Sequence, residues 1–595
     1  MASLDSLVED WISKDQNEAT RKEIQALKDA NNSDELEKRL RKRIEFGTAG
    51  LRGRMEAGFS RMNDLIIVQT SQGLCDYVSG HVDRAKERGV VIGHDHRHNS
   101  ERWAKLTAAV FLEQGFKVYL HRGLVHTPLV PFTIQETKAA AGVMITASHN
   151  PKQDNGYKVY WENAVQIISP HDTGIASAIL DSLEPRFTSP WNTVVESVGT
   201  HTQAMDVTQA MYDAYFARIK SVITPLPSDI GITFVTTPMH GVGQKPVTRA
   251  FQTIGLPPAS FHVVPEQEQP DPEFPTVSFP NPEEQENADY ILAQDPDADR
   301  FAAAQRRNDG SWHQFSGDQL GSLFAGRALS KYKRSGKALN QMAMVASTVS
   351  SKMIEAMAQK EGFKFVECLT GFKYIGNVAA RLVQDGLEVP FGYEEAIGFM
   401  VETGIRDKDG VSATVAFVEL VTELHARGST ALQNLEELYE RYGFFETKNS
   451  YFICNDPVTI DKIFARLRSY EPIIGEAWTS PLGASYPAKI AGLKVTSVRD
   501  LTSGFGYDSA APAPAYQPDL PLSGGHMITF RAGSIEKDGV AITLTIRTSG
   551  TEPKIKYYLE GQGTDRKRIG TILQNVVAEL REGWMEAKRH GLQEP

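Results

Sequence analysis

Three blocks of this chain share one pattern of apolar and polar positions. They are GVVIGHDHRHNSERWAKLTAAVFLEQGFKVYL (89–120), GITFVTTPMHGVGQKPVTRAFQTIGLPPASFHVV (231–264) and MAMVASTVSSKMIEAMAQKEGFKFVECL (342–369). In each block an apolar run is followed by a polar loop, a stretch with helical spacing, a glycine and a second apolar run. Strands that alternate with helices in this way form parallel βαβ units. The pattern therefore predicts three α/β domains built on one plan.

The segments beside these blocks follow other patterns. Residues 2–45 have the apolar spacing of two helices that are broken at ANNSDE, 30–35. The proline-rich stretch 265–282 cannot form a helix and predicts an extended surface loop, and the irregular stretch 502–525 predicts a mobile segment. After residue 446 the pattern becomes mixed α+β, and it ends in a helix over 570–591.

The length of the chain sets the number of domains. A chain of 595 residues is too long for a single hydrophobic core. From the shifts in pattern we predict three similar α/β domains at 1–221, 222–317 and 318–446, followed by a smaller α+β domain at 447–595.

Composition and charge narrow the functional classes. The 63 basic and 74 acidic residues give a formal net charge of −11 without long basic runs, which argues against nucleic acid as a partner. The cysteines are too few and too far apart for a disulfide framework or a CxxC metal site. No stretch approaches 18 uncharged apolar residues, and the N-terminal segment lacks an apolar signal core. We therefore expect a cytoplasmic protein that does not bind membranes.

The first segment that suggests chemistry is GVMITASHNPKQDNGYK, 142–158. Its apolar run ends at Ser148 and His149, and Lys158 follows after the Asn155-Gly156 turn. Ser, Asn, Pro and Gly are also ordinary turn residues. This stretch alone therefore fits either a nucleophilic serine or the simple end of a strand.

A second apolar run, in ILAQDPDADRFAAA (291–304), ends in Asp295, Asp297 and Asp299, with Arg300 directly after them. Carboxylates at every second position of an extended loop point to one side, as a hard divalent cation requires. The loop is not an EF-hand, because its sixth and twelfth positions are Arg300 and Arg306. Aspartates that cap turns are the alternative interpretation.

A glycine-flanked loop carries two adjacent carboxylates, Glu394 and Glu395, that could accept hydrogen bonds from sugar hydroxyls. An exposed acidic turn would have the same sequence. Lys373 lies in a second glycine-bounded loop upstream, and Lys408 lies in IRDKDG downstream.

Two further segments have the composition of phosphate-binding loops. In LTIRTSGTEPKIKYYLEG an arginine, hydroxyl groups and a close backbone approach are combined at Arg547, Ser549, Gly550 and Thr551. In EFGTAGLRGRM, 45–55, three glycines surround Arg52 in a flexible loop that could bring its guanidinium to a phosphate. A hairpin turn and a plain flexible turn are the respective alternatives.

Together these segments resemble the α-D-phosphohexomutase superfamily over nearly the whole chain, with the four family loops in the same order. The Thr-Ala-Ser-His-Asn-Pro loop and the Asp-x-Asp-x-Asp-Arg loop are highly specific when they occur together. FGTAGLRG, GYEEAIG and RTSGTEPKIKYYLE are most similar to the phosphopentomutase branch, which also includes glucose-1,6-bisphosphate synthase. The resemblance implies an α/β fold of four domains with the active site at their junction.

The resemblance also implies a mechanism and its residues. Ser148 would carry a phosphoryl group and donate it to a sugar monophosphate, and the resulting bisphosphate would reorient and return its other phosphate. Mg²⁺ would be held by the phosphorylated Ser148 and by Asp295, Asp297 and Asp299. Lys158 and His149 would be the general acid/base candidates, and Arg52 and Arg300 would supply positive charge. The residues on the sugar side would be Glu394, Glu395, Lys373 and Lys408. The non-transferred phosphate would be held by Arg547, Ser549, Gly550 and Thr551.

One departure from the family bears on the substrate. The glucose- and mannose-converting branches have a serine where this chain has Ala396. We therefore expect ribose 1-phosphate or deoxyribose 1-phosphate as substrate, lesser phosphoglucomutase activity, and ribose 1,5-bisphosphate or glucose 1,6-bisphosphate as activator. A phosphoglucomutase, a bisphosphate synthase that accepts an acyl phosphate, and an inactive sugar-phosphate-binding homologue are the alternatives. We expect a monomer or homodimer.

Overall fold

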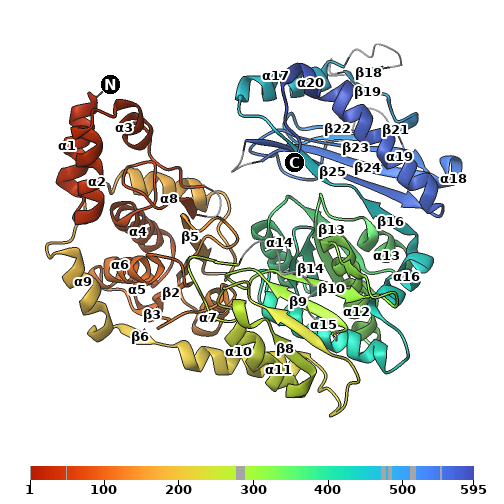
Figure 1. The fold of residues 1–595 in the computed structure, drawn as a ribbon, viewed down its shortest axis with the longest axis horizontal. Helices are drawn as coiled ribbons and strands as arrows, with labels where there is room; N and C mark the ends of the chain where they lie inside the picture. The colour runs from red at the N-terminus through yellow and green to blue at the C-terminus, as the bar shows by residue number, and fades with distance from the viewer. Residues whose placement is uncertain are drawn as a thin grey trace. The chain divides into compact units, whose positions relative to one another are not determined.

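The computed structural model describes residues 2–47, 50–276, 288–401, 403–470, 477–479, 485–509, 517–549 and 553–595 (Figure 1). These residues pack into two compact units. Unit 1 comprises Met1–Ala328 and Gly371–Ala431, and unit 2 comprises Leu329–Thr370 and Leu432–Pro595.

Unit 1 begins with three helices, α1 (Leu4–Lys14), α2 (Glu18–Asp29) and α3 (Ser33–Leu40). The side chains of Asn17 and Asn32 accept hydrogen bonds from backbone N–H groups at the start of α2 and α3, and so cap these helices. We expected two helices over 2–45. The break at 30–35 is confirmed, but the prediction of two helices is wrong because Asn17 starts a further helix that apolar spacing did not separate.

The first sheet of unit 1 has six strands in the order β1-β5-β4-β2-β3-β6. The strands are β1 (Gly50–Arg54), β2 (Val90–His94), β3 (Val118–Leu120), β4 (Ala141–Ile145), β5 (Asp154–Trp161) and β6 (Ala204–Asp206). Strands β4, β2, β3 and β6 are parallel, and β5 and β1 continue the sheet in antiparallel pairs. Its helices are α4 (Asp64–His81), α5 (Ala85–Arg88), α6 (Ser100–Glu113), α7 (Leu129–Thr137), α8 (His171–Leu180), α9 (Trp191–Ser197), a 3₁₀ turn (Val198–Thr200) and α10 (Thr208–Val222).

The second sheet of unit 1 has the order β11-β10-β9-β7-β8. Its strands are β7 (Phe234–Thr237), β8 (Phe261–Val263), β9 (Tyr290–Gln294), β10 (Phe301–Arg306) and β11 (Trp312–Gln314). Helix α11 (Gln244–Ile254) and a 3₁₀ turn (Pro258–Ser260) connect β7 to its parallel partner β8. Unit 1 also contains the start of α12 (Gly317–Arg334), α14 (Phe372–Gln384), the antiparallel pair β14 (Glu388–Glu394) and β15 (Gly398–Met400), and α15 (Gly410–His425).

Burial explains how unit 1 holds these elements together. Helices α6 and α7 both pack on β2 and β4, whose residues are all buried. Helix α15 is apolar on nearly every side and packs against α11, β9, β10 and β15. Asp409 caps α15 by accepting hydrogen bonds from the N–H groups of Val411 and Ser412. The loops that follow β9, β14 and β15 are thus held on a rigid helix.

Unit 2 contains a parallel strand pair and an antiparallel sheet. The pair is β12 (Met342–Ser347) and β13 (Lys364–Cys368), preceded by a 3₁₀ turn (Leu339–Gln341) and joined by α13 (Met353–Glu361). The antiparallel sheet has the order β16-β25-β24-β23-β21-β20, with β17 on β25 and β22 on β21. Its strands are β16 (Phe444–Thr447), β17 (Ser450–Ile453), β20 (Lys489–Ile490), β21 (Leu493–Asp500), β22 (Phe505–Asp508), β23 (Met527–Ser534), β24 (Val540–Thr548) and β25 (Lys554–Gly563).

The helices of unit 2 surround a second hydrophobic core. They are α16 (Ala431–Tyr442), α17 (Pro457–Arg468), α18 (Ile535–Asp538), α19 (Arg566–Glu579), a π turn (Leu580–Trp584) and α20 (Ala587–His590), and a separate hairpin joins β18 (Ala477–Thr479) to β19 (Ser485–Pro487). Helix α19 packs on β25 (Figure 1). The three expected strand–helix–strand blocks are confirmed as β2-α6-β3, β7-α11-β8 and β12-α13-β13, each with parallel strands. The α/β class and the additional C-terminal sheet are confirmed, whereas the four domain boundaries stay predictions.

Three local expectations need correction. The stretch 45–55 is not a flexible loop throughout, because Gly50–Arg54 forms β1 against β5, and a Cβ on Gly50 would lie 1.8 Å from the Tyr157 carbonyl oxygen. The proline-rich stretch forms a 3₁₀ turn at Pro265–Gln267, and its residues 277–282 lie outside the described residues. The irregular stretch contains β22, and its residues 510–516 lie outside the described residues.

Candidate active site

Ser148 lies in the loop that joins β4 to β5. The loop begins where β4 ends beside β2, at the register pair His94 and Ile145, so it shares the carboxyl edge of two parallel strands. The Ser148 N–H donates to Thr146 Oγ1 at 2.9 Å, and the residue is buried with φ of 54°, in the left-handed region. Its Oγ donates a 2.7 Å hydrogen bond to Asp295 Oδ2. The predicted nucleophile and the predicted metal loop therefore meet.

The three aspartates form one buried cluster. Ligand oxygens of Asp295, Asp297 and Asp299 lie within 4.8 Å of one another in the loop between β9 and β10. Oδ1 of Asp297 and Oδ1 of Asp299 are buried without a hydrogen-bond partner among the described residues. Buried carboxylate oxygens are costly unless they are paired or bind a cation. The cluster therefore fits a hard divalent cation, which prefers oxygen ligands.

Two lysines and a threonine surround the aspartates. Lys158 Nζ, on β5, donates to Asp297 Oδ2 at 2.7 Å and to Asp299 Oδ2 at 2.9 Å. Lys408 Nζ lies 2.9 Å from Asp299 Oδ2, and Thr127 Oγ1 donates to Asp297 Oδ2 at 2.6 Å. The structure thus brings Lys408 to the metal loop, where the sequence had suggested a place beside the sugar.

The three carboxyls differ in their electrostatics. Burial raises the pKa of Asp295 to about 7, and the charges of Asp297 and Asp299 add to the rise. Burial also disfavours ionisation of Asp297 and Asp299, yet Lys158 and Lys408 bring the pKa of both carboxyls below the ordinary value. Neighbouring carboxyls with separated pKa values are typical of functional sites.

His149 and Arg300 lie beside Ser148. Arg300 NH1 is 3.0 Å from His149 Nδ1, and Ser148 Oγ is 3.3 Å from the same nitrogen. Desolvation of the ring and the charges of Arg300 and Arg52 lower the pKa of His149. Because the guanidinium can only donate, we assign Nδ1 as the acceptor and the ring as neutral.

Arg52 joins this group from β1. Its backbone pairs with Gly156 of β5, and its NH1 donates to Asn150 Oδ1 at 3.0 Å. The side chain is otherwise exposed. Arg52 therefore stands beside the serine loop with donors that remain available to an anion.

The sugar-loop candidates lie in a tight hairpin. Glu394 ends β14 opposite Gly398 of β15, and it is buried, whereas Ala396 is exposed at the tip. Burial raises the pKa of Glu394 to about 7. A Cβ on Gly398 would lie 3.0 Å from Lys408 Cδ and 3.1 Å from Glu394 Cγ. Both side chains therefore lie close against this glycine.

Lys373 lies apart from this cluster of contacts. It occupies the first turn of α14, with its Nζ 4.9 Å from the centre of the Tyr374 ring. Burial lowers its pKa to about 8. Among the described residues, no hydrogen bond or ion pair joins Lys373 to the aspartates or to Glu394.

The phosphate-loop candidates belong to unit 2. Arg547 NH1 donates to the Thr548 carbonyl oxygen at 3.1 Å, and its NH2 donates to Tyr558 Oη at 3.0 Å. The Ser549 N–H donates to the Lys554 carbonyl oxygen at 2.9 Å, so the loop is also a hairpin connection. Gly550 and Thr551 lie outside the described residues.

Three loops of unit 1 at this site, the serine loop, the aspartate loop and the β14–β15 hairpin, each contain one non-glycine residue with left-handed backbone. These residues are Ser148 (φ 54°), Ala298 (φ 53°) and Ile397 (φ 56°). This conformation is uncommon for residues with a Cβ and is most unfavourable for a β-branched residue such as Ile397. The loop shapes are therefore imposed by their surroundings.

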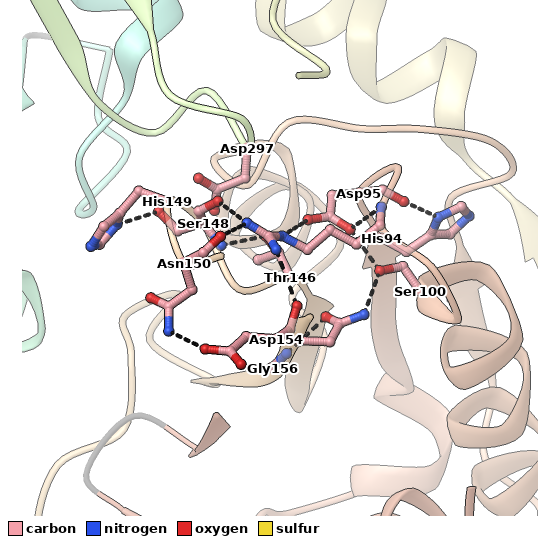
Figure 2. Close-up of polar contacts among 12 residues, drawn as sticks. His94, Asp95, Ser100, Thr146, Ser148, His149, Asn150, Asp154, Gly156 and Asp297 are labelled. Carbon is pink, nitrogen blue, oxygen red and sulfur yellow. Dashed lines mark hydrogen bonds and ion pairs between the residues drawn. The ribbon is translucent and has the colours of Figure 1, made fainter. Parts of the chain in front are cut away.

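Sequence reasoning missed several residues of the site. Thr127 and Arg97 contact Asp297 and the serine loop, respectively, and Asp95 and Ser100 lie behind that loop (Figure 2). The polar run Asp95-His-Arg97 follows a fully buried strand, β2, and this position could have marked it as part of the site.

Comparison with known proteins agrees with this geometry. Residues 43–186, 213–310 and 316–442 match the phosphoglucomutase/phosphomannomutase alpha/beta/alpha domains I, II and III. A probable phosphoribomutase of Schizosaccharomyces pombe is 41% identical over 100% of this chain and 99% of its own. The chain belongs to the phosphoglucomutase/phosphomannomutase family.

A second curated member of this family, glucose 1,6-bisphosphate synthase of Homo sapiens, is 41% identical over 99% of this chain and 95% of its own. The open form of the Paramecium phosphoglucomutase pp63/parafusin has a TM-score of 0.62 at 17% identity, covering 93% of this chain and 96% of that one, which supports the fold. Among the described residues, no helix is long and apolar enough to cross a membrane.

Proposed function

We propose that this protein is a phosphosugar mutase that interconverts pentose 1-phosphate and pentose 5-phosphate through a phosphoserine at Ser148. The observation that carries the proposal is the 2.7 Å hydrogen bond between Ser148 Oγ and Asp295 Oδ2 in a buried cluster of three aspartates. A serine hydroxyl is a weak nucleophile alone, and phosphoryl transfer depends on positioning and on neutralisation of charge.

The charges of the site support this chemistry. Asp295, Asp297 and Asp299, with an oxygen of the serine phosphate, would hold Mg²⁺, which supplies positive charge to the transferring phosphoryl group. The serine phosphate adds a charge of about −2 at neutral pH. Lys158, Lys408 and Arg300 provide three positive side chains at this point. With the divalent cation, these groups balance the carboxylates and the phosphate.

The transfer involves one bond broken and one bond formed. The Ser148 Oγ–P bond breaks as an oxygen of the sugar phosphate's free hydroxyl bonds to the same phosphorus; that hydroxyl loses its proton, and the leaving Ser148 Oγ gains one and returns to a hydroxyl. The return step reverses these changes from the other phosphate of the bisphosphate. Lys158 and His149 are the candidates for moving the proton. Neutral His149 can accept one, whereas Lys158 is hydrogen-bonded to two carboxylates as a donor.

We assign the remaining residues to substrate. Arg52 and Arg300 would bind the phosphate near Ser148, and Glu394, Glu395 and Lys373 would contact the sugar. Arg547, with Ser549, Gly550 and Thr551, would hold the non-transferred phosphate. Ala396 lacks the hydroxyl that the hexose-converting branches have at this place, which favours a pentose. A sugar bisphosphate, ribose 1,5-bisphosphate or glucose 1,6-bisphosphate, would act as the activator.

Intact-mass spectrometry and a substrate panel test the proposal. The wild type should carry one phosphoryl group and the Ser148→Ala variant none, and the variant should lose turnover. Ser79→Ala is the control, because Ser79 is exposed on α4 and donates only to its own helix. The wild type should have a higher kcat/KM for ribose 1-phosphate or deoxyribose 1-phosphate than for glucose 1-phosphate. Mutase turnover by Ser148→Ala would refute the phosphoserine.

The second candidate function is synthesis of glucose 1,6-bisphosphate from an acyl phosphate. The 41% identity to the human synthase favours it. Both reactions would use Ser148, so the discriminating measurement is mutase flux against bisphosphate formation from 1,3-bisphosphoglycerate in the same preparation. A higher rate of bisphosphate formation would favour the synthase.

A further inference from the structure

Arg97 lies beneath the serine loop, in the connection from β2 to α6. Its side chain is 1% exposed. Its NH2 donates to the backbone carbonyl oxygens of Ser148 and Asn150 at 2.7 and 2.6 Å. Its NH1 donates to those of Pro151 and Asp154 at 2.9 and 3.1 Å. One planar guanidinium therefore binds four carbonyl groups of a loop that is seven residues long from Ser148 to Asp154.

Arg97 is itself held from behind. Asp95 Oδ1 accepts hydrogen bonds from the Arg97 N–H at 3.0 Å and from Ser100 Oγ at 2.6 Å, and Asp95 Oδ2 lies 3.5 Å from Arg97 Nε. The Phe274 ring lies 5.2 Å from the guanidinium carbon. Figure 2 shows Asp95 and Ser100 on one side of the loop that carries Ser148, Asn150 and Asp154. The loop carbonyls, Asp95 and Phe274 together therefore hold the Arg97 side chain in place.

These contacts leave little of Arg97 for a ligand. An arginine has five N–H donors, and four of them are directed at the backbone of the serine loop. Arg52 differs, since within the part of the chain that the structure describes its exposed guanidinium makes a single hydrogen bond, to Asn150. A residue that binds substrate phosphate needs free donors, whereas a residue that shapes a loop does not.

The loop has a conformation that it would not adopt unaided. Ser148 has φ of 54°, and its own carbonyl oxygen is one of the four acceptors. Fixing this carbonyl fixes the rotation of the peptide that follows Ser148 and, with the Thr146 bond to the Ser148 N–H, the direction of the Cα–Cβ bond. The position of Oγ opposite Asp295 follows from that direction.

We propose that Arg97 is a positioning residue for phosphoryl transfer, which sets the place of the Ser148 oxygen by binding the backbone carbonyls of its loop. The inference rests on the proposed function of Ser148. It predicts an effect on the transfer step and not on substrate affinity, because the buried Arg97 side chain contacts the backbone of the serine loop and has no exposed donor for a substrate.

The test compares Arg97→Ala and Arg97→Lys with Arg88→Ala. Arg88 is a matched control, because it also donates to backbone carbonyls of the same sheet region, at Lys138 (2.9 Å) and Ala139 (3.3 Å). We expect Arg97→Ala to lower kcat about 100-fold, with KM nearly unchanged, since small misplacements of a reacting atom cost about this much. The kcat of Arg97→Lys should lie between those of the wild type and Arg97→Ala, because an ammonium group offers only three hydrogen-bond donors. Arg88→Ala should keep the wild-type kcat.

Two measurements separate positioning from simple loss of structure. Guanidinium ion, added far below denaturing concentration, should raise the kcat of Arg97→Ala and leave that of Arg88→Ala unchanged. Single-turnover transfer of labelled phosphate from Ser148 should be slowed by the same factor as kcat. If Arg97→Ala does not fold, single-turnover transfer by Arg97→Lys decides, since it should be slowed by the same factor as its kcat.

The outcomes are distinct. Wild-type kcat in a folded Arg97 variant, or a raised KM with unchanged kcat, would overturn the inference. Turnover by Ser148→Ala would instead overturn the proposed function. An inactive Ser148→Ala together with a fully active Arg97→Ala would refute only the role of Arg97.

Discussion

Lys158 Nζ lies 2.7 Å from Asp297 Oδ2, and the two side chains are 8% and 0% exposed. The ammonium group also donates to Asp299 at 2.9 Å. This lysine is therefore the partner of two buried carboxylates. A divalent cation bound by these aspartates would act on the same negative charges as Lys158, and the effects of the two on stability would then depend on each other.

Substitution of Lys158 should show how the stability of the protein depends on both Lys158 and the cation. Breaking a buried ion pair leaves an uncompensated charge and costs about 3–5 kcal/mol. We expect Lys158→Met to lower the thermal stability of the metal-free protein, and added Mg²⁺ to restore more of it than in the wild type. Thermal unfolding with EDTA and with Mg²⁺ measures both effects. Lys152→Met is the control, because Lys152 pairs with Glu273 at the surface. Equal responses to Mg²⁺ in all three proteins would contradict this prediction.

Asp297→Asn should affect turnover more than stability. The change keeps the size of the side chain but removes a charged ligand, and a metal ion supplies several kcal/mol of transition-state stabilisation. We expect kcat to fall on the order of 100-fold or more at low Mg²⁺. Asp309→Asn, at an exposed turn, should have no effect. Full turnover of the wild type in EDTA would show that the aspartate loop does not need a metal.

The stability of the protein should depend on the ionisation of Glu394. Burial raises its pKa from an ordinary value of 4.5 to about 7. A folded-state pKa above the unfolded one stabilises the fold fully below about pH 4.5, and this contribution is lost as the pH rises through about 7. The difference corresponds to roughly 3 kcal/mol. Glu394→Gln should therefore melt higher than the wild type at pH 8 and similarly at pH 4.5.

The control for this prediction is Glu388→Gln, at the exposed start of the same strand. Its melting temperature should follow the wild type at each pH. Parallel pH profiles for Glu394→Gln and the wild type would show that Glu394 ionises in the folded protein as it does in water.

Arg547→Ala should raise KM. The guanidinium now contacts Thr548 and Tyr558, and loss of a charge-assisted pair with phosphate costs about 2–3 kcal/mol. We therefore expect KM to rise roughly 30- to 150-fold, with phosphorylation of Ser148 by the activator retained. Steady-state kinetics and intact mass measure these quantities. Arg531→Ala, on the neighbouring strand β23, is the control. A wild-type KM in Arg547→Ala would show that the substrate phosphate is bound at another place.

Ala396→Ser should improve the reaction with glucose 1-phosphate. The residue is at the tip of the β14–β15 hairpin, beside Glu395, and the added hydroxyl would pair with a sugar hydroxyl. An unpaired buried polar group costs about 1–3 kcal/mol, which is roughly a five- to hundredfold change in kcat/KM. The ratio of kcat/KM for ribose 1-phosphate to that for glucose 1-phosphate should fall in Ala396→Ser and stay constant in Ala426→Ser. A wild type that prefers glucose 1-phosphate would contradict the idea.

Much of the fold and of the site could be predicted from the sequence, because apolar runs mark the strands and the polar residues of the site follow where these runs end. Strand β4 is buried and β9 alternates buried and half-buried residues, and polar residues of the loops after them, Ser148 and Asp295, proved to be in contact. The spacing of apolar residues in each parallel strand–helix–strand unit is a property of that unit's own sequence and does not depend on distant residues. These features are local, so pattern alone predicts them.

Other features depend on distant partners and could not be predicted. The bonds of Arg97 are to backbone carbonyls, which carry no side-chain signal, and Thr127 reaches Asp297 across 170 positions of sequence. Strand β1 forms in a glycine-rich stretch only because β5 offers it an edge. Lys408 resembled a sugar ligand in sequence, and only the folded chain shows its ammonium beside Asp299.

The left-handed residues at Ser148, Ala298 and Ile397 imply a trade-off between stability and activity. Left-handed backbone at a non-glycine residue costs on the order of 1 kcal/mol or more, and here that cost recurs in the serine loop, the aspartate loop and the β14–β15 hairpin. Selection for thermal stability alone would favour glycine at these positions, since glycine adopts positive φ freely. At Ser148 that change would remove the hydroxyl that we propose as the phosphate carrier. The strain at this residue therefore has to be offset by stability elsewhere in the chain, in its cores and helix termini.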